Sequence, residues 1–332
     1  MTHPSGRTAP LRAIASRHAA CLFAGFALVA ATRVGAQTLP PIYDATPVQL
    51  APARTVAEFP KGTFLENIAI DGQGRLHVNS HLDGKIYRVD AEGRLAVWAQ
   101  VPGTVAGIAL NPDGSAVVSG WIDGKEPAVF AISAEGSSSV LVRLPQGQFP
   151  NGVVRLAPGR FLVADSYRGV IWSIDAVQRT ATLWLAHASL TRADPNNPTP
   201  GVNGLQIFGG ALYASNTARQ LLIRVPLNEG TAGVPQTLLR DVGLDDFAFD
   251  DRGNLYGTTH VYNSLVRITP EGRMTVIAGL AQGMAGSTAV AAVADPGQGW
   301  RLYAVTNGGL SLPPPGGLQA ARIVRVDIKA QP

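Results

Sequence analysis

Cysteine is almost absent from the sequence, which has a single one, Cys21, among 332 residues. Cys21 falls in an N-terminal segment that we expect to be removed, so the mature chain would have no disulfide and no thiol chemistry. A G-x-S-x-G motif is also missing, which argues against a serine hydrolase triad built on Ser166 and His260. The Gly-Gly pairs lack a strand–loop–helix context and therefore indicate no phosphate-binding loop.

Charged residues are few, at 15% of the chain, and the excess of positive charge comes from the N-terminus. Residues 1–36 contain Arg7, Arg12, Arg17 and Arg33 and no acid. The 23 lysines and arginines that remain of the 27 equal the 23 aspartates and glutamates, so the mature chain has no net charge when histidine is neutral. Binding to nucleic acid or to an anionic membrane therefore loses its main support.

The N-terminus has the features of a secretory signal peptide. Three arginines precede the apolar segment 19–31, and Val34-Gly35-Ala36 supplies a cleavage site before Gln37. The apolar segment is short for a membrane span, and a membrane anchor is the alternative interpretation. We therefore expect residues 1–36 to be a signal peptide, residues 37–54 to be a Pro- and Ala-rich lead-in, and the protein to be exported, either periplasmic or secreted, with no membrane contact after cleavage.

The sequence contains an internal repeat. It also has 37 glycines and 24 prolines, which suit many short strands and tight turns. In residues 244–279, four short apolar runs are separated by turns rich in Asp, Gly and Pro, which is typical of an antiparallel meander. Similar units recur about every forty residues, a period that favours a β-propeller. The six units open at Leu65, Ala106, Asn151, Asn203, Leu244 and Ser287.

The sixth unit lacks a fourth strand, and the strand-like residues 55–59 before the first unit lack a partner. Pairing the two would close the ring and remove both sheet edges. The sequence thus predicts an all-β fold, a six-bladed β-propeller with four-stranded antiparallel blades and a ring closed by an N-terminal strand, as one domain over residues 55–332. Two Pro-rich insertions, at 191–201 and 308–319, have a length that is often functional.

The central channel is where the repeats bring polar residues together. In a propeller the first strand of each blade lines the channel, and it begins at the same mouth where the second strand ends. The residues before the first strands should therefore point to one place. In chain order they are Glu66, Ala106, Asn151, Asn203, Asp246 and Ser287.

Four of these six residues carry carboxylate or amide oxygens, and two are anionic, so they form a candidate site for a hard cation. Ca²⁺ suits such ligands best, and Mg²⁺ and Mn²⁺ are also compatible. The absence of His and Cys at these positions argues against Zn²⁺ without excluding it. The alternative is that Asn-Gly at 151–152 and 203–204 are ordinary turns and that Asp246 caps a turn, but four oxygen ligands in register favour the metal site.

The blade openings Leu65-Glu66-Asn67, Pro150-Asn151-Gly152, Val202-Asn203-Gly204 and Asp245-Asp246-Phe247 resemble those of the senescence-marker-protein/gluconolactonase/luciferin-regenerating family. The resemblance extends from Phe59 to Lys329, and segments 244–256 and 302–309 are similar to its secreted microbial branch. It implies six blades, one divalent metal ion on the axis held by a Glu, two Asn and an Asp, and the hydrolysis of lactones, which many members catalyse.

Carried over to this chain, the resemblance implies that Glu66, Asn151, Asn203 and Asp246 are the metal ligands and that Asp246 also deprotonates the attacking water. The fifth blade has Asp-Asp-Phe where the family has Pro-Asp-Gly, so Asp245 is the other candidate for the fourth ligand, although the register favours Asp246. His260, which ends the second strand of that blade, is either a proton carrier or a hydrogen-bonded structural histidine.

Other residues at the ends of second strands, or before first strands, should line the pocket. Asp165 could instead orient Asn151. The predicted pocket residues are His81, Trp121, Asp165, Ser166, Asn216, Ser287 and Asn307.

The sequence therefore predicts an exported, monomeric, metal-dependent hydrolase of a lactone or related cyclic ester, with a small-molecule substrate. The metal ion would polarise the carbonyl group and activate water. Two alternatives remain open: a phosphotriesterase-like hydrolase that uses the same metal, and a propeller that binds a ligand or a protein without catalysis.

Overall fold

The structure is a computed structural model that describes Met1, Tyr43 and residues 45–329. The chain divides into two units, Met1–Gln37 and Thr38–Pro332. The predicted signal peptide, residues 1–36, lies outside the described residues apart from Met1. Within the described part of the chain, no helix is long and apolar enough to cross a membrane.

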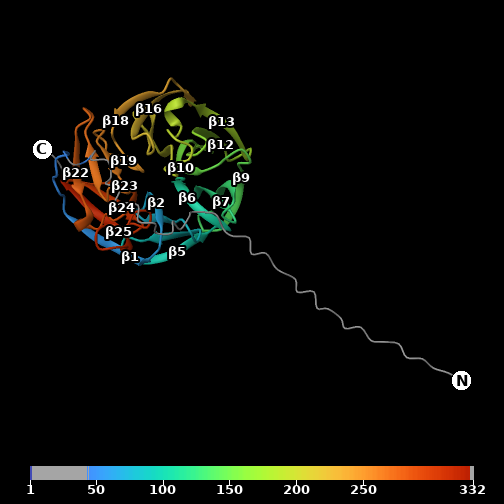
Figure 1. Ribbon diagram of the computed structural model, residues 1–332, viewed down its shortest axis with the longest axis horizontal. Helices are drawn as coiled ribbons and strands as arrows, with labels where there is room; N and C mark the ends of the chain where they lie inside the picture. Colours follow the sequence, from blue (N-terminus) through green and yellow to red (C-terminus); the bar gives the residue numbers. More distant parts are fainter. Residues whose placement is uncertain (2–42, 44, 330–332) are drawn as a thin grey trace. The chain divides into compact units, whose positions relative to one another are not determined.

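The second unit is a ring of six antiparallel sheets, which confirms the predicted six-bladed propeller (Figure 1). Blade 1 consists of β2 (Leu65–Ile70), β3 (Leu76–Ser80), β4 (Lys85–Val89) and β5 (Leu95–Gln100). Blade 2 consists of β6 (Gly103–Leu110), β7 (Ala116–Ile122), β8 (Glu126–Ile132) and β9 (Ser138–Arg143). Blade 3 consists of β10 (Pro150–Ala157), β11 (Arg160–Asp165), β12 (Val170–Asp175) and β13 (Thr180–Ala186).

The second half of the ring follows the same order of strands, with one addition in blade 4. That blade consists of β14 (Val202–Phe208), β15 (Ala211–Asn216), β16 (Leu221–Asn228) and β18 (Gln236–Arg240), with a short extra strand β17 (Thr231–Ala232) beside the end of β16. Blade 5 consists of β19 (Phe247–Phe249), β20 (Leu255–Thr258), β21 (Leu265–Ile268) and β22 (Met274–Ala278). The 3₁₀ turns η1 (Ala188–Leu190) and η2 (Leu280–Gln282) follow blades 3 and 5.

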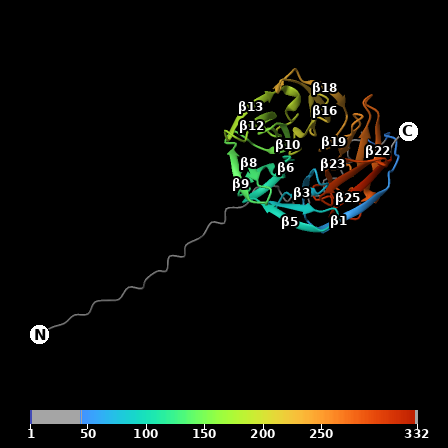
Figure 2. The same ribbon diagram turned by 180° about the vertical axis from the view of Figure 1, so that it is seen from behind.

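Blade 6 contains both ends of the described propeller, as the unpaired residues 55–59 predict. It consists of β23 (Ser287–Asp295), β24 (Gly299–Thr306), β25 (Ala320–Lys329) and β1 (Ala53–Lys61). Strand β1 pairs antiparallel with β25 from Ala53 opposite Val326 to Lys61 opposite Ala320. Figures 1 and 2 both show blue β1 beside red β25, so the N-terminal strand closes the ring.

The lead-in before β1 covers the outer edge of blade 5. Gln49 N and Ala51 N donate to the carbonyls of Val276 and Ile277 at 2.9 and 2.8 Å, and Val276 N donates to Pro47 O at 2.8 Å. These bonds place the lead-in alongside β22, where Val48 forms a parallel bridge with Val276. An exposed strand edge is thereby paired before the chain enters blade 6.

The hydrophobic core lies between the blades. Within the described residues, six buried clusters join each blade to the next one around the ring. In β8, for example, Phe130 packs toward blade 1 and the adjacent Val129 packs toward blade 3. Successive strand residues point to opposite faces, so each blade uses both of its faces for packing.

Buried polar side chains also join the blades, always near the start of the next first strand. At each of the six junctions a side chain donates a hydrogen bond of 2.5–2.8 Å to a backbone carbonyl of the following blade. Buried donors and carbonyls paired in this way avoid the cost of desolvation without a partner. The six bonds run from Asn79 to Ala106, Ser119 to Asn151, Ser166 to Val202, Ser215 to Asp245, Thr258 to Thr288, and Thr288 to Leu65.

The glycines that follow Asn151 and Asn203 serve the contact between blades, because both lie within strands rather than in turns. A Cβ atom on Gly152 would lie 2.3 Å from Asn203 O, and one on Gly204 would clash with the Asp246 carboxylate. The alternative interpretation of the two Asn-Gly pairs as ordinary turns is therefore wrong. Only a residue without a side chain allows neighbouring first strands to approach this closely.

We expect Thr288→Val to lower the free energy of unfolding by about 1–2 kcal/mol, because this isosteric change deprives the buried Leu65 carbonyl of its hydrogen bond. The measurement is a urea denaturation midpoint. Thr231→Val is the matched control, since the Thr231 hydroxyl bonds Asn228 O at 2.6 Å at an exposed position. Equal effects of the two substitutions would contradict a special contribution of the bonds between blades.

Candidate functional site

The residues predicted to bind a metal lie where the first strands begin, within a local irregularity of the strand pairing. In β2, Leu65 pairs with Ser80 and Asn67 with Asn79, so Glu66 between them has no partner. The same shift of register follows Pro150 in β10 and Val202 in β14, where it involves Asn151 and Asn203. Bulges of this kind re-aim side chains, and here they act on equivalent residues of three blades.

In the fifth blade Asp245, rather than Asp246, occupies this equivalent position. The backbone N–H of Gly204 donates to the Ser215 hydroxyl at 2.9 Å, and the N–H of Asp246 donates in the same way to Thr258 at 3.3 Å. Asp246 therefore corresponds to Gly204, and Asp245 corresponds to Asn203. The register expected from the sequence, which placed Asp246 at this position, therefore differs by one residue from the register in the structure. The role of Asp246 as a metal ligand stays a prediction.

Both asparagine side chains have their amide nitrogens bonded to the protein. Asn151 Nδ2 donates to Ser166 Oγ at 3.3 Å. Asn203 Nδ2 donates to Thr217 Oγ1 at 3.1 Å and to Asp245 Oδ1 at 2.5 Å. Because the nitrogens are held in this way, each Oδ1 is left as the group that can bind a ligand.

The surroundings of Glu66 disfavour its ionised form. Its Oε2 is buried and has no hydrogen-bond partner among the described residues. Burial, followed by the charges of Asp245 and Asp246, raises the pKa of Glu66 well above its usual value. Asp245 and Asp246 thus lie close enough to disfavour the ionised form of Glu66.

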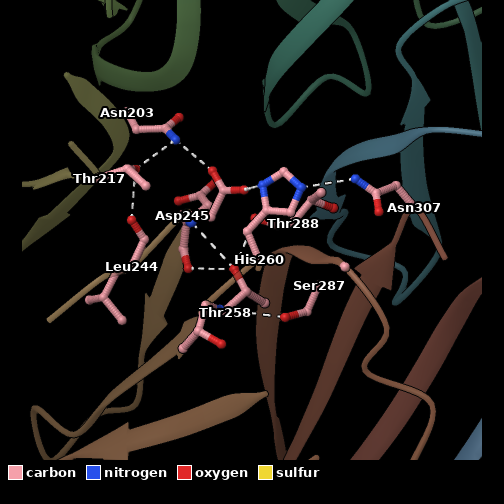
Figure 3. A network of polar contacts seen from close by, with 12 residues as sticks. Asn203, Thr217, Leu244, Asp245, Thr258, His260, Ser287, Thr288 and Asn307 are labelled. Carbon is pink, nitrogen blue, oxygen red and sulfur yellow. Dashed lines mark hydrogen bonds and ion pairs between the residues drawn. The ribbon is translucent and has the colours of Figure 1, made fainter. Parts of the chain in front are cut away.

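Asp245 lies between Asn203 and His260 and contacts both side chains (Figure 3). Its Oδ2 lies 2.8 Å from His260 Nδ1, and His260 Nε2 lies 3.0 Å from Asn307 Nδ2. An amide nitrogen can only donate, so Nε2 accepts and the proton of a neutral His260 resides on Nδ1, facing Asp245. Asn307 is itself oriented, since its Oδ1 accepts the N–H groups of Gly309 and Leu310 at 2.9 and 3.0 Å.

Asp246 reaches across the ring to blade 1. Its Oδ2 accepts a hydrogen bond from Asn67 Nδ2 at 2.9 Å, and its Oδ1 accepts one from Phe247 N at 2.7 Å. Burial raises the pKa of Asp246 to about 7, against the lowering effect of these two donors. Asp246 and Asn67 line an axial cavity of about 540 Å³ that is bounded by the innermost strands of all six blades.

The donor set fits a hard divalent cation. A buried carboxylate oxygen of Glu66 without a partner, two amide oxygens whose nitrogens are already hydrogen-bonded, and a further carboxylate are the ligand types that Ca²⁺ takes. A cation among them would also relieve the mutual repulsion of the carboxylates. Within the described residues, no group of three or more His, Cys, Asp and Glu side chains is arranged to hold a metal ion, so the amide oxygens are essential to any such site.

Some of the residues predicted to line the pocket form hydrogen bonds within the protein scaffold. Asp165 accepts the N–H groups of Gln148 and Phe149 at 3.0 and 2.9 Å, and it is Ser166, not Asp165, that contacts Asn151. The Ser287 hydroxyl donates to Ser264 O at 2.9 Å. Asn216 Nδ2 donates to the carbonyls of Ser189 and Thr191 at 2.7 and 3.0 Å.

His81 and Trp121 lie next to each other near the start of β2 and the end of β7. The His81 ring contacts the ring of Phe64 at 5.2 Å and that of Trp121 at 5.9 Å between centroids. Its Nδ1 lies 2.6 Å from Val105 O, and burial lowers the pKa of His81. This histidine is therefore favoured in its neutral form.

Two polar residues of the site, Asn67 and Thr217, were not predicted from the sequence. Asn67 directly follows Glu66 in the opening motif of blade 1, and Thr217 directly follows the second strand of blade 4. The same strand-end rule that identified Asn216 and Asn307 could have found Thr217. Nothing in the sequence shows that Asn67 bonds Asp246, because the two residues are 179 positions apart.

Comparisons with known proteins give matches at the level of structure. No protein-family model matches the sequence, and no curated protein matches it. A calcium-binding protein, regucalcin, from Agrobacterium tumefaciens superposes with a TM-score of 0.63 at 17% identity, covering 86% of this chain and 98% of that one. A luciferin-regenerating enzyme superposes with a TM-score of 0.63 at 14% identity, covering 84% and 95%.

A gluconolactonase from Xanthomonas campestris gives a similar result, with a TM-score of 0.60 and 15% identity over 83% of this chain and 90% of that one. These identities establish a shared fold, while activity has to be argued from the site itself. Membership of a secreted microbial branch stays a prediction. The chain is thus a six-bladed β-propeller whose structural neighbours include proteins of the senescence-marker-protein/gluconolactonase/luciferin-regenerating family.

Proposed function

We propose that the protein is an exported, divalent-metal-dependent hydrolase of a lactone or related cyclic ester. Export rests on the N-terminal arginines, apolar segment and small residues of 1–36. The hydrolase assignment is supported by the calcium-binding and gluconolactonase propellers among the structural neighbours. It depends most on the site, where carboxylate or amide side chains occupy the same position in four blades.

Glu66, Asn151, Asn203 and Asp245 would hold the cation, with Ca²⁺ as the best fit and Asp246 as the alternative fourth ligand. When bound, the cation would polarise the lactone carbonyl and make a water molecule more acidic. The chain itself supplies orientation: Ser166 and Thr217 hold the two amides, and His260 holds Asp245. Side chains fixed in advance need no reorganisation during the reaction.

Asp246 is the residue best suited to take a proton from water. A general base works best when its pKa lies near the working pH, and burial raises the pKa of Asp246 to about 7. Asn67 and the backbone N–H of Phe247 fix the carboxylate in place. Once it releases Asn307, the unprotonated Nε2 of His260 can accept a proton while its Nδ1–H stays bonded to Asp245.

We expect Glu66→Gln to weaken Ca²⁺ binding at least about tenfold, because one anionic ligand is lost. Isothermal titration calorimetry on the chelator-treated protein measures this. Glu271→Gln is the control, since Glu271 lies on an exposed turn of the same propeller and bonds Thr269 and Arg273. Equal Ca²⁺ affinity in the Glu66 variant and the wild type would rule out the metal site.

The two adjacent aspartates should separate into two roles. We expect Asp246→Asn to lower lactone turnover by about 10²- to 10⁴-fold with Ca²⁺ still bound, as for the loss of a general base. Asp245→Asn should mainly weaken Ca²⁺ binding, because it removes a ligand carboxylate. Steady-state kinetics on a panel of lactones and phosphotriesters, with and without chelator, combined with calorimetry, distinguishes these outcomes. Unchanged turnover in Asp246→Asn would contradict its role.

The raised pKa of Asp246 predicts how the stability of the metal-free protein changes with pH. The pKa is about 7 in the folded protein and 3.8 for an unperturbed aspartate. The folded state thus holds the proton more tightly, so this stabilisation is complete below about pH 4 and is lost as the pH rises through about 7. We expect the urea midpoint to fall between about pH 5 and 8, and to fall less in Asp246→Asn. A midpoint that rises over this interval in the wild type, or falls equally in both proteins, would contradict the prediction.

A further inference from the structure

A continuous series of aromatic rings surrounds much of the mouth where the first strands begin. Consecutive ring centroids lie 4.6–6.2 Å apart, mostly in edge-to-face geometry. Contacts of this kind are favourable beyond the area they bury. We call the series the aromatic rim; in order, it consists of His260, Phe64, His81, Trp121, Phe149 and Tyr167.

The aromatic rim is adjacent to the candidate metal ligands in both sequence and space. Phe64 precedes Glu66 by two residues, and Phe149 precedes Asn151 by two residues. At one end of the rim, His260 bonds Asp245. A substrate that places its reactive carbonyl group among the ligands would therefore extend against these rings.

Arg192, from the insertion 191–201, completes the other end of the rim. Its guanidinium carbon lies 4.0 Å from the centroid of the Tyr167 ring, and its Nη1 donates to Asn197 O at 3.0 Å. Arg192 Nε is buried without a hydrogen-bond partner, and no carboxylate of the described residues forms an ion pair with this arginine. A flat guanidinium that is stacked on a ring and has unused donors suits a planar anion such as a carboxylate.

The insertion that carries Arg192 is firmly attached to the blades. Tyr167 Oη donates to Pro198 O at 2.9 Å. Asn216 and Arg219 both donate to Thr191 O, at 3.0 and 2.8 Å. Arg192 is therefore held at a defined place, which a specific recognition residue requires.

We propose that the rim and Arg192 select the substrate: an aromatic lactone that carries an anionic substituent, with its ring against Trp121 and Phe149 and its anion on Arg192. The lactone part of this inference rests on the proposed function, whereas the preference for an aromatic anion stands on the rim alone. A polyhydroxylated sugar would need polar partners for each hydroxyl group, and rings do not supply them.

Binding of three small probes to the chelator-treated full-length protein tests the preference without catalysis or metal. Phenylacetate has both the ring and the anion, cyclohexylacetate has the anion and a saturated ring, and 2-phenylethanol has the ring alone. We expect phenylacetate to bind about tenfold more tightly than either of the others, as one charge-assisted hydrogen bond or one ring contact would give. Titration calorimetry gives the affinities, and equal affinities, or no binding of phenylacetate, would overturn the proposal.

Two variants and one control locate the binding. Arg192→Gln should reduce phenylacetate affinity about tenfold and leave 2-phenylethanol unaffected, while Trp121→Leu should weaken both. Arg168→Gln is the matched control, because the guanidinium of Arg168 is also stacked on a ring, that of Trp172, at 5.0 Å. Arg168 belongs to blade 3, as Tyr167 does. Circular dichroism shows whether each variant is folded. If the two arginine variants behave alike, general charge rather than Arg192 accounts for the binding, and the proposal is wrong.

Kinetics with Ca²⁺ present separate this inference from the proposed function. An aromatic lactone with a carboxylate substituent should be hydrolysed with a higher kcat/KM than gluconolactone, and Arg192→Gln should raise KM more than it lowers kcat. If phenylacetate binds but no lactone is hydrolysed, the proposed function fails and the ligand preference stands. If gluconolactone is the better substrate and phenylacetate does not bind, the preference fails and the function stands.

Discussion

The hydrogen bond from a buried side chain of one blade to a first-strand carbonyl of the next is the constraint on which the site depends. Each of the six bonds ends at or beside a residue near the channel mouth, among them Asn151 and Asp245. The bonds therefore determine how far apart neighbouring first strands lie. Gly152 and Gly204 allow the close approach of these strands. The positions of the preceding Asn151 and Asn203 side chains are therefore fixed by the backbone.

Acidic and basic side chains occupy different places at the channel mouth where the first strands begin. Three acidic residues, Glu66, Asp245 and Asp246, lie near the axis, and the pKa values of Glu66 and Asp246 are raised there. Arg192 offers positive charge beyond the aromatic rim, without an acidic partner among the described residues. If a cation were bound by the acidic residues, such a pattern would favour a ligand with a carbonyl oxygen at one end and an anion at the other.

The repeats made the fold predictable, because turn residues and apolar runs recur in every blade and the unpaired residues 55–59 required a partner. The positions of Glu66, Asn151 and Asn203 followed from the same repeats. The fifth blade was harder: its first strand has only three residues, Phe247–Phe249, so the register around Asp245 and Asp246 depends on backbone bonds that the sequence does not reveal. Three members of the rim, His81, Trp121 and His260, were predicted as site residues. The other three, Phe64, Phe149 and Tyr167, were not, because nothing in the sequence shows that their rings contact one another.

Strand β1 has a consequence for how the molecule is made. Its partner β25 lies more than 250 residues away along the chain, so the last blade cannot assemble until β25 has left the ribosome. Contacts between such distant segments form slowly, since a large loop must close first. Until then, the faces of blades 1 and 6 remain uncovered and prone to association with other chains. A binding partner that shields these strands during synthesis would therefore raise the yield of folded protein.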